Sequence, residues 1–314
     1  MCGRDKFTKR SFDHRKQWLV LRFSELVEIF AIEICAYAVM SNHYHLVLRV
    51  NAEHAENWSD QEVASRWSRL YNNATAKKVA NGESLDSEEK AMIKTAVPIW
   101  RERLKDISWF MRNINEPLAR TANEEDECKG RFWEGRFKCQ ALIDDAALLT
   151  CLAYVDLNPI RAGIANTLQQ SEFTSIQQRI RMFREKQRAA SSEQRKNEKS
   201  TETAVPRLAA FSDEKTKSRH ATESSLPIEF ASYLALIDWT GRAIRYDKKG
   251  AIPSDVAPIL TELGIETTQW LTGVRQFNKR FYSVAGGIEA LQAWCERLQQ
   301  SWLKGFSFSR QIFQ

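Results

Sequence analysis

The amino-acid sequence predicts an α+β protein, and three observations support this fold class. Residues 15–31 carry apolar side chains at the spacing of one helical face: Leu19, Phe23, Leu26, Val27 and Phe30. Residues 32–40 and 43–50 are apolar runs separated by the polar pair Ser41-Asn42, a pattern typical of a β-hairpin. Helical spacing returns over much of the remaining chain.

The elements that follow the hairpin are mainly helical. Residues 51–106 are polar and charged with helical stretches, and we interpret them as a helical insertion. Helical spacing continues over 104–120, and residues 131–143 are expected to form an extended basic-aromatic segment that ends in a strand. Asp144 is a suitable N-cap for a further helix over 145–157.

A charged segment divides the second half of the chain. Residues 179–199 hold eight Lys/Arg against three Asp/Glu and few large apolar residues. This composition is typical of a solvated segment, so we expect a charged linker over 181–225. Apolar helical patterns resume after it and predict a small helical C-terminal domain over 226–314.

Composition limits the function classes without choosing one. The chain has 314 residues, a formal net charge of +6 and a pI of about 9.0, which suggests an anionic partner but does not identify nucleic acid. Six cysteines are scattered with no C-x-x-C pair, as expected in a reducing compartment. No apolar run reaches the roughly 20 residues that span a bilayer. We therefore expect a soluble cytoplasmic protein with no membrane partner.

His43 and His45 are the first candidate for chemistry. Side chains two apart on a strand project from the same face, so two imidazoles could hold one divalent ion while Tyr44 points the other way. A pair of surface histidines is the alternative interpretation, since H-x-H is a weak motif by itself.

Tyr154 and Asn158 are the second candidate. They are four residues apart on the helix expected over 145–157 and its end, so both project from one face about a turn apart. A tyrosine hydroxyl is a competent nucleophile when a cation polarises its target, and an amide oxygen can complete the shell of that cation. The alternatives are a packing tyrosine and an ordinary helix-ending Asn-Pro pair.

A third feature is the run from Lys129 to Lys138, K-G-R-F-W-E-G-R-F-K. Its alternation of cations with Phe132, Trp133 and Phe137 suits phosphate contacts interleaved with base-stacking surfaces. An amphipathic edge strand with snorkelling cations is the alternative.

Together these segments resemble the single-tyrosine HUH transposases. The run A-Y-A-V-M-S-N-H-Y-H-L-V-L (36–48) resembles their histidine-hydrophobic-histidine signature. G-R-F-W-E-G-R-F-K (130–138) and Y-V-D-L-N-P-I-R-A-G (154–163) resemble the closing motifs of the REP-associated tyrosine transposase branch. The resemblance implies a catalytic domain over 1–180 with a ferredoxin-like (RRM-like) α+β core that carries the insertion 51–106.

The resemblance also implies a mechanism and its residues. Tyr154 would attack a phosphate of single-stranded DNA at a hairpin-forming repeat and form a 5′-phosphotyrosine link. A Mg²⁺ or Mn²⁺ ion held by His43, His45 and Asn158 would polarise that phosphate. The expected DNA contacts are Arg131, Trp133, Arg136, Lys138 and Arg161. The protein would be nucleoid-associated, and either a monomer or a homodimer fits the resemblance.

One departure keeps an alternative open. Family members carry a strand ahead of the first helix, whereas this chain begins close to where that helix starts. Loss of a central strand would leave sheet edges unpaired, so activity lost by truncation and a non-catalytic DNA-binding relic remain alternatives. An unrelated metal-dependent hydrolase would need a carboxylate near the histidine pair, and Glu33 is the nearest strand candidate.

Overall fold

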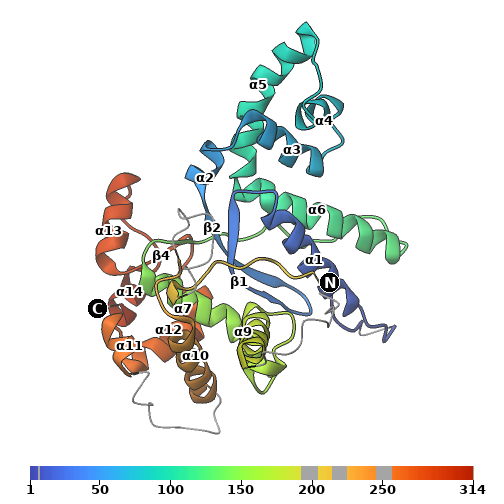
Figure 1. The fold of residues 1–314 in the computed structure, drawn as a ribbon. Helices are drawn as coiled ribbons and strands as arrows, with labels where there is room; N and C mark the ends of the chain where they lie inside the picture. Colours follow the sequence, from blue (N-terminus) through green and yellow to red (C-terminus); the bar gives the residue numbers. More distant parts are fainter. Residues whose placement is uncertain (6–7, 192–203, 214–224, 245–256, 314) are drawn as a thin grey trace.

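A β-hairpin lies at the centre of the fold in the computed structural model, which describes residues 1–5, 8–191, 204–213, 225–244 and 257–313 (Figure 1). Strands β1 (Ile32–Val39) and β2 (Tyr44–Val50) pair antiparallel, with Ala38 opposite His45. Met40 N–H donates to the His43 carbonyl (2.9 Å) and closes the turn. The predicted hairpin is confirmed, with each strand one residue shorter at the turn.

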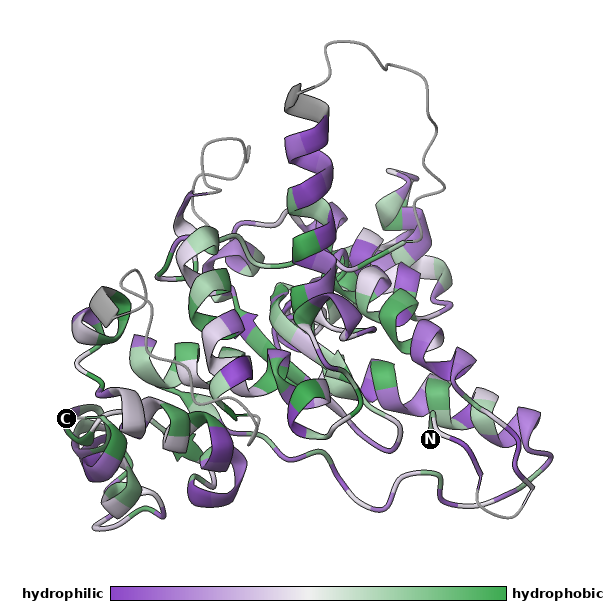
Figure 2. Cartoon of the chain, turned by 90° about the horizontal axis from the view of Figure 1, so that it is seen from below, coloured by the Kyte–Doolittle hydropathy of each residue, from purple (hydrophilic) through white to green (hydrophobic). Residues whose placement is uncertain are grey.

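The two faces of the hairpin carry separate hydrophobic cores. Ile34, Tyr37 and Val39 face the first core, whereas Ala36, Ala38 and Val47 face the second. The hydrophobic residues gather on the strands and on the helix faces turned toward them (Figure 2). Strand β1 is therefore buried on both sides, which explains why its sequence is an almost continuous apolar run, whereas β2 is only partly buried.

The first core is closed by the N-terminal helix and by the insertion. Helices α1 (His14–Val27) and α6 (Ile107–Glu125) pack side by side on the hairpin. The insertion is helical as predicted and projects from the sheet in Figure 1. Its helices are α2 (Ala52–Glu56), α3 (Asp60–Leu70), α4 (Ala74–Ala80) and α5 (Ser87–Leu104). Trp67 and Trp100 stack at 5.6 Å between ring centroids and join α3 to α5.

The second core is built around α7 (Asp145–Asp156), which begins at the predicted N-cap: the Asp144 carboxylate accepts from Ala147 N–H (2.8 Å). The C-terminal region is helical as predicted, but its apolar residues share one core with α7 and β1. The other elements on this side are α8 (Asn158–Arg161), the 3₁₀ turn η1 (Leu168–Gln170), α9 (Ser175–Ser191), α10 (Phe230–Ile244), α11 (Ala257–Glu262), α12 (Thr267–Arg280), α13 (Ile288–Arg297) and α14 (Phe306–Ile312).

A second, very short sheet joins distant parts of the chain. Strand β3 (Ala141–Leu142) ends the extended basic-aromatic segment, as predicted, and pairs in parallel with β4 (Val284–Ala285). Ala141 N–H donates to the Ser283 carbonyl (2.8 Å), and Gly287 N–H donates to the Asp144 carboxylate (2.5 Å). The start of α7 is thereby held against the C-terminal region.

The ferredoxin-like sheet that the resemblance implies is not evident, and that expectation is corrected. Within the described residues the hairpin forms a two-stranded sheet. Single backbone contacts occupy the outer edge of β1: Ala209 N–H donates to the Ile34 carbonyl (2.9 Å) and Val39 N–H to the Phe173 carbonyl (3.0 Å). These bonds satisfy the edge without a third strand.

Two other expectations concern the chain ends of this core. The residues described ahead of α1 form no strand. Cys2 N–H donates to the Ser41 carbonyl (2.6 Å), and the backbones of Arg4 and Ser11 form a single isolated antiparallel β-bridge. The expected linker 181–225 is corrected in part, because α9 continues to Ser191 and Phe211 is buried. Residues 192–203 and 214–224 of that linker lie outside the described chain.

A buried polar network fixes the end of α7. The Asp156 carboxylate accepts hydrogen bonds from Ser175 Oγ of α9 (2.5 Å) and from Tyr233 Oη of α10 (2.6 Å). Ser175 Oγ also accepts from Tyr37 N–H of β1 (2.9 Å). Four elements therefore meet at Asp156, two residues after Tyr154, and restrict where Tyr154 can lie.

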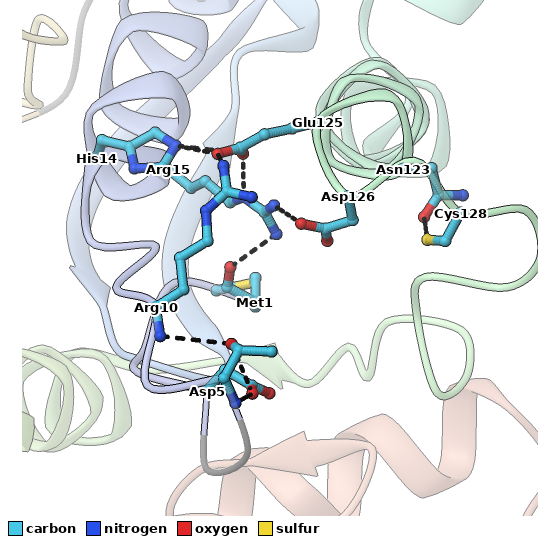
Figure 3. Close-up of polar contacts among 10 residues, drawn as sticks. Met1, Asp5, Arg10, His14, Arg15, Asn123, Glu125, Asp126 and Cys128 are labelled. Carbon is cyan, nitrogen blue, oxygen red and sulfur yellow. Dashed lines mark hydrogen bonds and ion pairs between the residues drawn. The ribbon is translucent and has the colours of Figure 1, made fainter.

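A charged cluster ties the N-terminal residues to the end of α6 (Figure 3). The buried Arg15 guanidinium pairs with Glu125 (2.7 Å) and Asp126 (2.5 Å) and donates to the Met1 carbonyl (3.4 Å). His14 and Arg10 add exposed contacts to Glu125.

Among the described helices, none has both the length and the apolarity needed to cross a membrane.

Candidate active site

The two histidines lie where the hairpin turn enters β2, His43 one residue before the strand and His45 within it, on the hairpin face that packs against α7. His45 pairs with Ala38 on the strand and faces the second core. Tyr44 points to the opposite face, where its hydroxyl donates to Asn115 Oδ1 (2.6 Å) and its ring lies 5.9 Å from that of Phe23. The alternation that the sequence predicts for this segment is confirmed.

The histidine rings lie together, and burial favours the neutral form of both. Their centroids are 4.8 Å apart. Burial lowers the pKa of both imidazoles, that of His45 to about 4, with the charges of His43 and Arg161 adding to the His45 shift. His43 Nδ1 is within hydrogen-bond distance of Asn42 Oδ1 (2.7 Å), which favours the tautomer with a proton on Nδ1 and a lone pair on Nε2. Neutral imidazoles are the form that binds metal ions.

Tyr154 lies directly against this pair. Its ring centroid is 5.5 Å from that of His45, in an edge-to-face arrangement. The ring is 6% exposed and is covered on another side by Phe277 of α12, 6.2 Å away. Burial raises the pKa of the Tyr154 hydroxyl, and the charge and hydrogen bond of Arg161 oppose this shift.

Arg161 reaches Tyr154 because the chain breaks between α7 and α8. Pro159 lacks an N–H and is tolerated in the first turn of α8, so a new short helix starts at Asn158 instead of continuing α7. The Arg161 guanidinium then lies 4.2 Å from the centroid of the Tyr154 ring. Its Nη2 donates to the carbonyl of Arg275 on α12 (3.1 Å), which holds it in place.

Three polar atoms around this tyrosine are buried without a hydrogen-bond partner. They are His45 Nε2, Asn158 Nδ2 and Arg161 Nη1. A buried polar atom left unsatisfied costs about 1–3 kcal/mol, so such atoms are uncommon and mark positions where a ligand would complete the bonding. Their side chains contact Tyr154 or start one helical turn from it. This concentration of unmet bonding capacity is what distinguishes the site from the ordinary core around it.

Two neutral imidazoles and one amide are the groups near Tyr154 whose chemistry suits a divalent ion. Within the described residues no group of three or more His, Cys, Asp or Glu side chains could hold a metal, so an ion here would use the two imidazoles and the Asn158 amide. The amide oxygen and nitrogen exchange places by rotation of the side chain, so the unpartnered atom can be either one. Because three neutral ligands neither fill the coordination shell of such an ion nor cancel its positive charge, phosphate oxygens could occupy the remaining positions.

The predicted DNA contacts differ in their surroundings. Arg131, Arg136 and Lys138 are exposed on the extended segment before β3, whereas Arg161 lies inside the site. Trp133 is half-buried: its indole N–H donates to the Asn115 carbonyl (3.0 Å), and its ring lies 6.0 Å from that of Tyr44, on the hairpin face opposite His45. Much of the Trp133 ring is thereby engaged in packing.

Sequence reasoning missed the contribution of α12. Phe277 covers Tyr154, and the Arg275 carbonyl holds Arg161, although both lie more than a hundred residues after the motifs. The local sequence has no signal for these contacts, because they depend on how α12 packs on α7.

No family model, curated protein or solved structure matches the chain.

The carboxylate that a hydrolase would need near the histidines is engaged elsewhere. Glu33 forms an ion pair with Arg49 (2.6 Å), the residue opposite it on β2, at the far end of the hairpin from His45. That alternative therefore has no support in the site.

Proposed function

We propose that the chain is a single-tyrosine DNA strand transferase of the HUH transposase type, with Tyr154 as the nucleophile. The observation that carries the proposal is the position of the Tyr154 ring. Its centroid lies 5.5 Å from that of the His45 ring and 4.2 Å from the Arg161 guanidinium, and buried polar atoms without partners lie around it. The β-hairpin β1–β2 and the helices α7 and α8 are the elements that carry these residues.

The residues divide the chemistry among them. Tyr154 Oη attacks the scissile phosphorus, the bond from phosphorus to the 3′ oxygen breaks, and a 5′-phosphotyrosine and a 3′-hydroxyl result. Attack by a 3′-hydroxyl on the phosphotyrosine reverses these bonds and joins strands without a nucleotide cofactor. Arg161 offers its free Nη1 to the developing charge on the phosphate and lowers the pKa of the Tyr154 hydroxyl. His43, His45 and Asn158 would hold a Mg²⁺ or Mn²⁺ ion, which would supply Lewis-acid polarisation of the phosphate when bound.

A second candidate is a DNA-binding protein of the same ancestry without catalysis. The low exposure of Tyr154, 6%, favours it, because a phosphate must reach the hydroxyl past Phe277. The transferase requires α12 to move aside when DNA binds, whereas a binding protein does not.

A covalent-adduct assay separates the two candidates. The full chain is incubated with Mn²⁺ and a single-stranded oligonucleotide that carries a hairpin and a 3′ label, and products are separated under denaturing conditions. A labelled protein band is expected for the natural chain and for Tyr71→Phe, a control at a half-buried tyrosine of the helical insertion. It should be absent for Tyr154→Phe and in chelator. Binding without an adduct across a set of hairpins would refute the transferase.

A further inference from the structure

Two large aromatic side chains are exposed near the C-terminus. Tyr282, between α12 and β4, is 74% exposed, and Trp302, in the loop between α13 and α14, is 68% exposed. Both rings leave most of their apolar area in water, which is unfavourable by roughly 25 cal/mol for each Å². Exposed aromatic rings of this size are characteristic of binding surfaces.

Cations accompany these rings. Lys304 Nζ lies 6.0 Å from the centroid of the Tyr282 ring, and Arg280 is two residues before Tyr282. Residues 275–313 hold six Lys/Arg against two Glu. Neither Arg280 nor Lys304 forms an ion pair with another described residue, so no carboxylate neutralises their charge. The Arg280 guanidinium does donate to Gln276 Oε1 (2.7 Å) and lies 5.6 Å from the centroid of the Phe308 ring. We refer to Arg280, Tyr282, Trp302 and Lys304 as the aromatic surface.

The β3–β4 pairing brings the aromatic surface to the basic-aromatic loop, Lys129–Lys138. The two strands run parallel with Ala141 opposite Val284, so the chain entering β3 and the chain entering β4 arrive from the same side. The first is the exposed stretch Arg136-Phe137-Lys138, in which Phe137 is 37% exposed, and the second contains Tyr282. Two basic-aromatic segments about 140 residues apart in sequence therefore adjoin.

We propose that the aromatic surface and the end of the basic-aromatic loop form one binding surface for single-stranded DNA. Exposed rings can stack on unpaired bases, and the cations between them can follow the phosphates. A duplex keeps its bases stacked on one another, so the combination favours a single strand. The helix α7 begins three residues after β3, and Tyr154 lies nine residues along it, a rise of about 14 Å from the start of the helix. The identification of the bound strand as the reaction substrate rests on the proposed transferase function; the binding itself does not.

Fluorescence anisotropy with labelled oligothymidine and the full chain tests the surface. Tyr282→Ala combined with Trp302→Ala should weaken binding about 25-fold, the product of two rings at about fivefold each. Tyr282→Phe combined with Trp302→Phe should retain binding because flat rings remain. Arg136→Ala combined with Lys138→Ala should reduce the slope of log affinity against log salt by about 1.4. The control is Met92→Ala with Ile99→Ala, exposed apolar residues on α5, which should change nothing.

Three results would overturn the inference. They are an unchanged affinity in the alanine pair, an equal loss on a duplex of the same length, and an equal loss on polyglutamate, which would indicate a general polyanion surface. The adduct assay on the same samples separates this inference from the proposed function. If the natural chain forms no adduct but the alanine pair loses affinity for the single strand, the transferase is refuted and the surface stands.

Discussion

Replacing Arg161 by methionine is the most informative change in the candidate site. Methionine keeps much of the length and apolar stem of arginine but removes the guanidinium that lies 4.2 Å from the Tyr154 ring. It also removes the unpartnered Nη1 that we assign to the phosphate. The change therefore separates the electrostatic role of Arg161 from its packing.

The structure sets the size of the expected effect. Removing one pre-positioned donor from a developing oxyanion typically lowers a rate by about 10²–10³. The bond from Nη2 to the Arg275 carbonyl (3.1 Å) is lost as well, and a single hydrogen bond of this kind contributes roughly 1 kcal/mol to stability. We expect Arg161→Met to fold and to bind DNA, with adduct formation slowed about 10²–10³-fold.

The pH dependence gives a second, independent expectation. Burial raises the pKa of the Tyr154 hydroxyl and Arg161 lowers it, so loss of Arg161 raises that pKa further. The fraction of tyrosinate in the variant then rises only at higher pH. The rate deficit of Arg161→Met should consequently be constant well below the pKa of Tyr154 in the natural chain and should shrink only as the pH rises through that pKa.

Single-turnover formation of the labelled adduct at several pH values measures both quantities. Arg275→Met is the matched control, because the Arg275 side chain turns to the Ala243 and Ile244 carbonyls (3.3 Å each) while its backbone carbonyl still holds Arg161. A rate for Arg161→Met within about threefold of the natural chain, with no change in its pH profile, would refute the assignment of Arg161 to the chemistry.

Three further expectations concern stability and the cover of the site. Arg15→Met should lower the free energy of unfolding in urea by about 2–3 kcal/mol, because the acidic pair at the end of α6 loses its buried partner; a change below about 0.5 kcal/mol would contradict this. Burial raises the pKa of Asp156, and the hydrogen bond from Tyr233 opposes the shift. Stability should therefore fall as pH rises from the ordinary carboxyl value of about 4 through the folded pKa. Tyr233→Phe removes a hydrogen bond that lowers the pKa of Asp156, so the fall in stability should extend to higher pH. The variant should also lose about 1–3 kcal/mol of unfolding free energy, and an unchanged pH profile would argue against this expectation. Phe277→Leu should increase solvent access to Tyr154, seen as faster nitration of that tyrosine by mass spectrometry, and equal nitration would show that Phe277 is no cover.

The sequence by itself determined the elements whose pattern is local. The alternation around His43-Tyr44-His45 places His45 and Tyr44 on opposite faces, because side chains alternate along a strand whatever surrounds it. The N-cap at Asp144 and the break at Pro159 are equally local, since they follow from one carboxylate and one missing N–H.

Only the tertiary structure decided what surrounds Tyr154. Its contacts with His45 and Phe277 join residues more than a hundred positions apart, and the depth of its burial depends on α12 lying over α7. The same holds for the outer edge of β1. There Ala209 N–H donates to the strand and the Phe173 carbonyl accepts from it, in the positions where a further strand would have paired. A periodic pattern tells which face of an element is apolar, but many partners can cover an apolar face. The choice among them is made by packing across the whole chain.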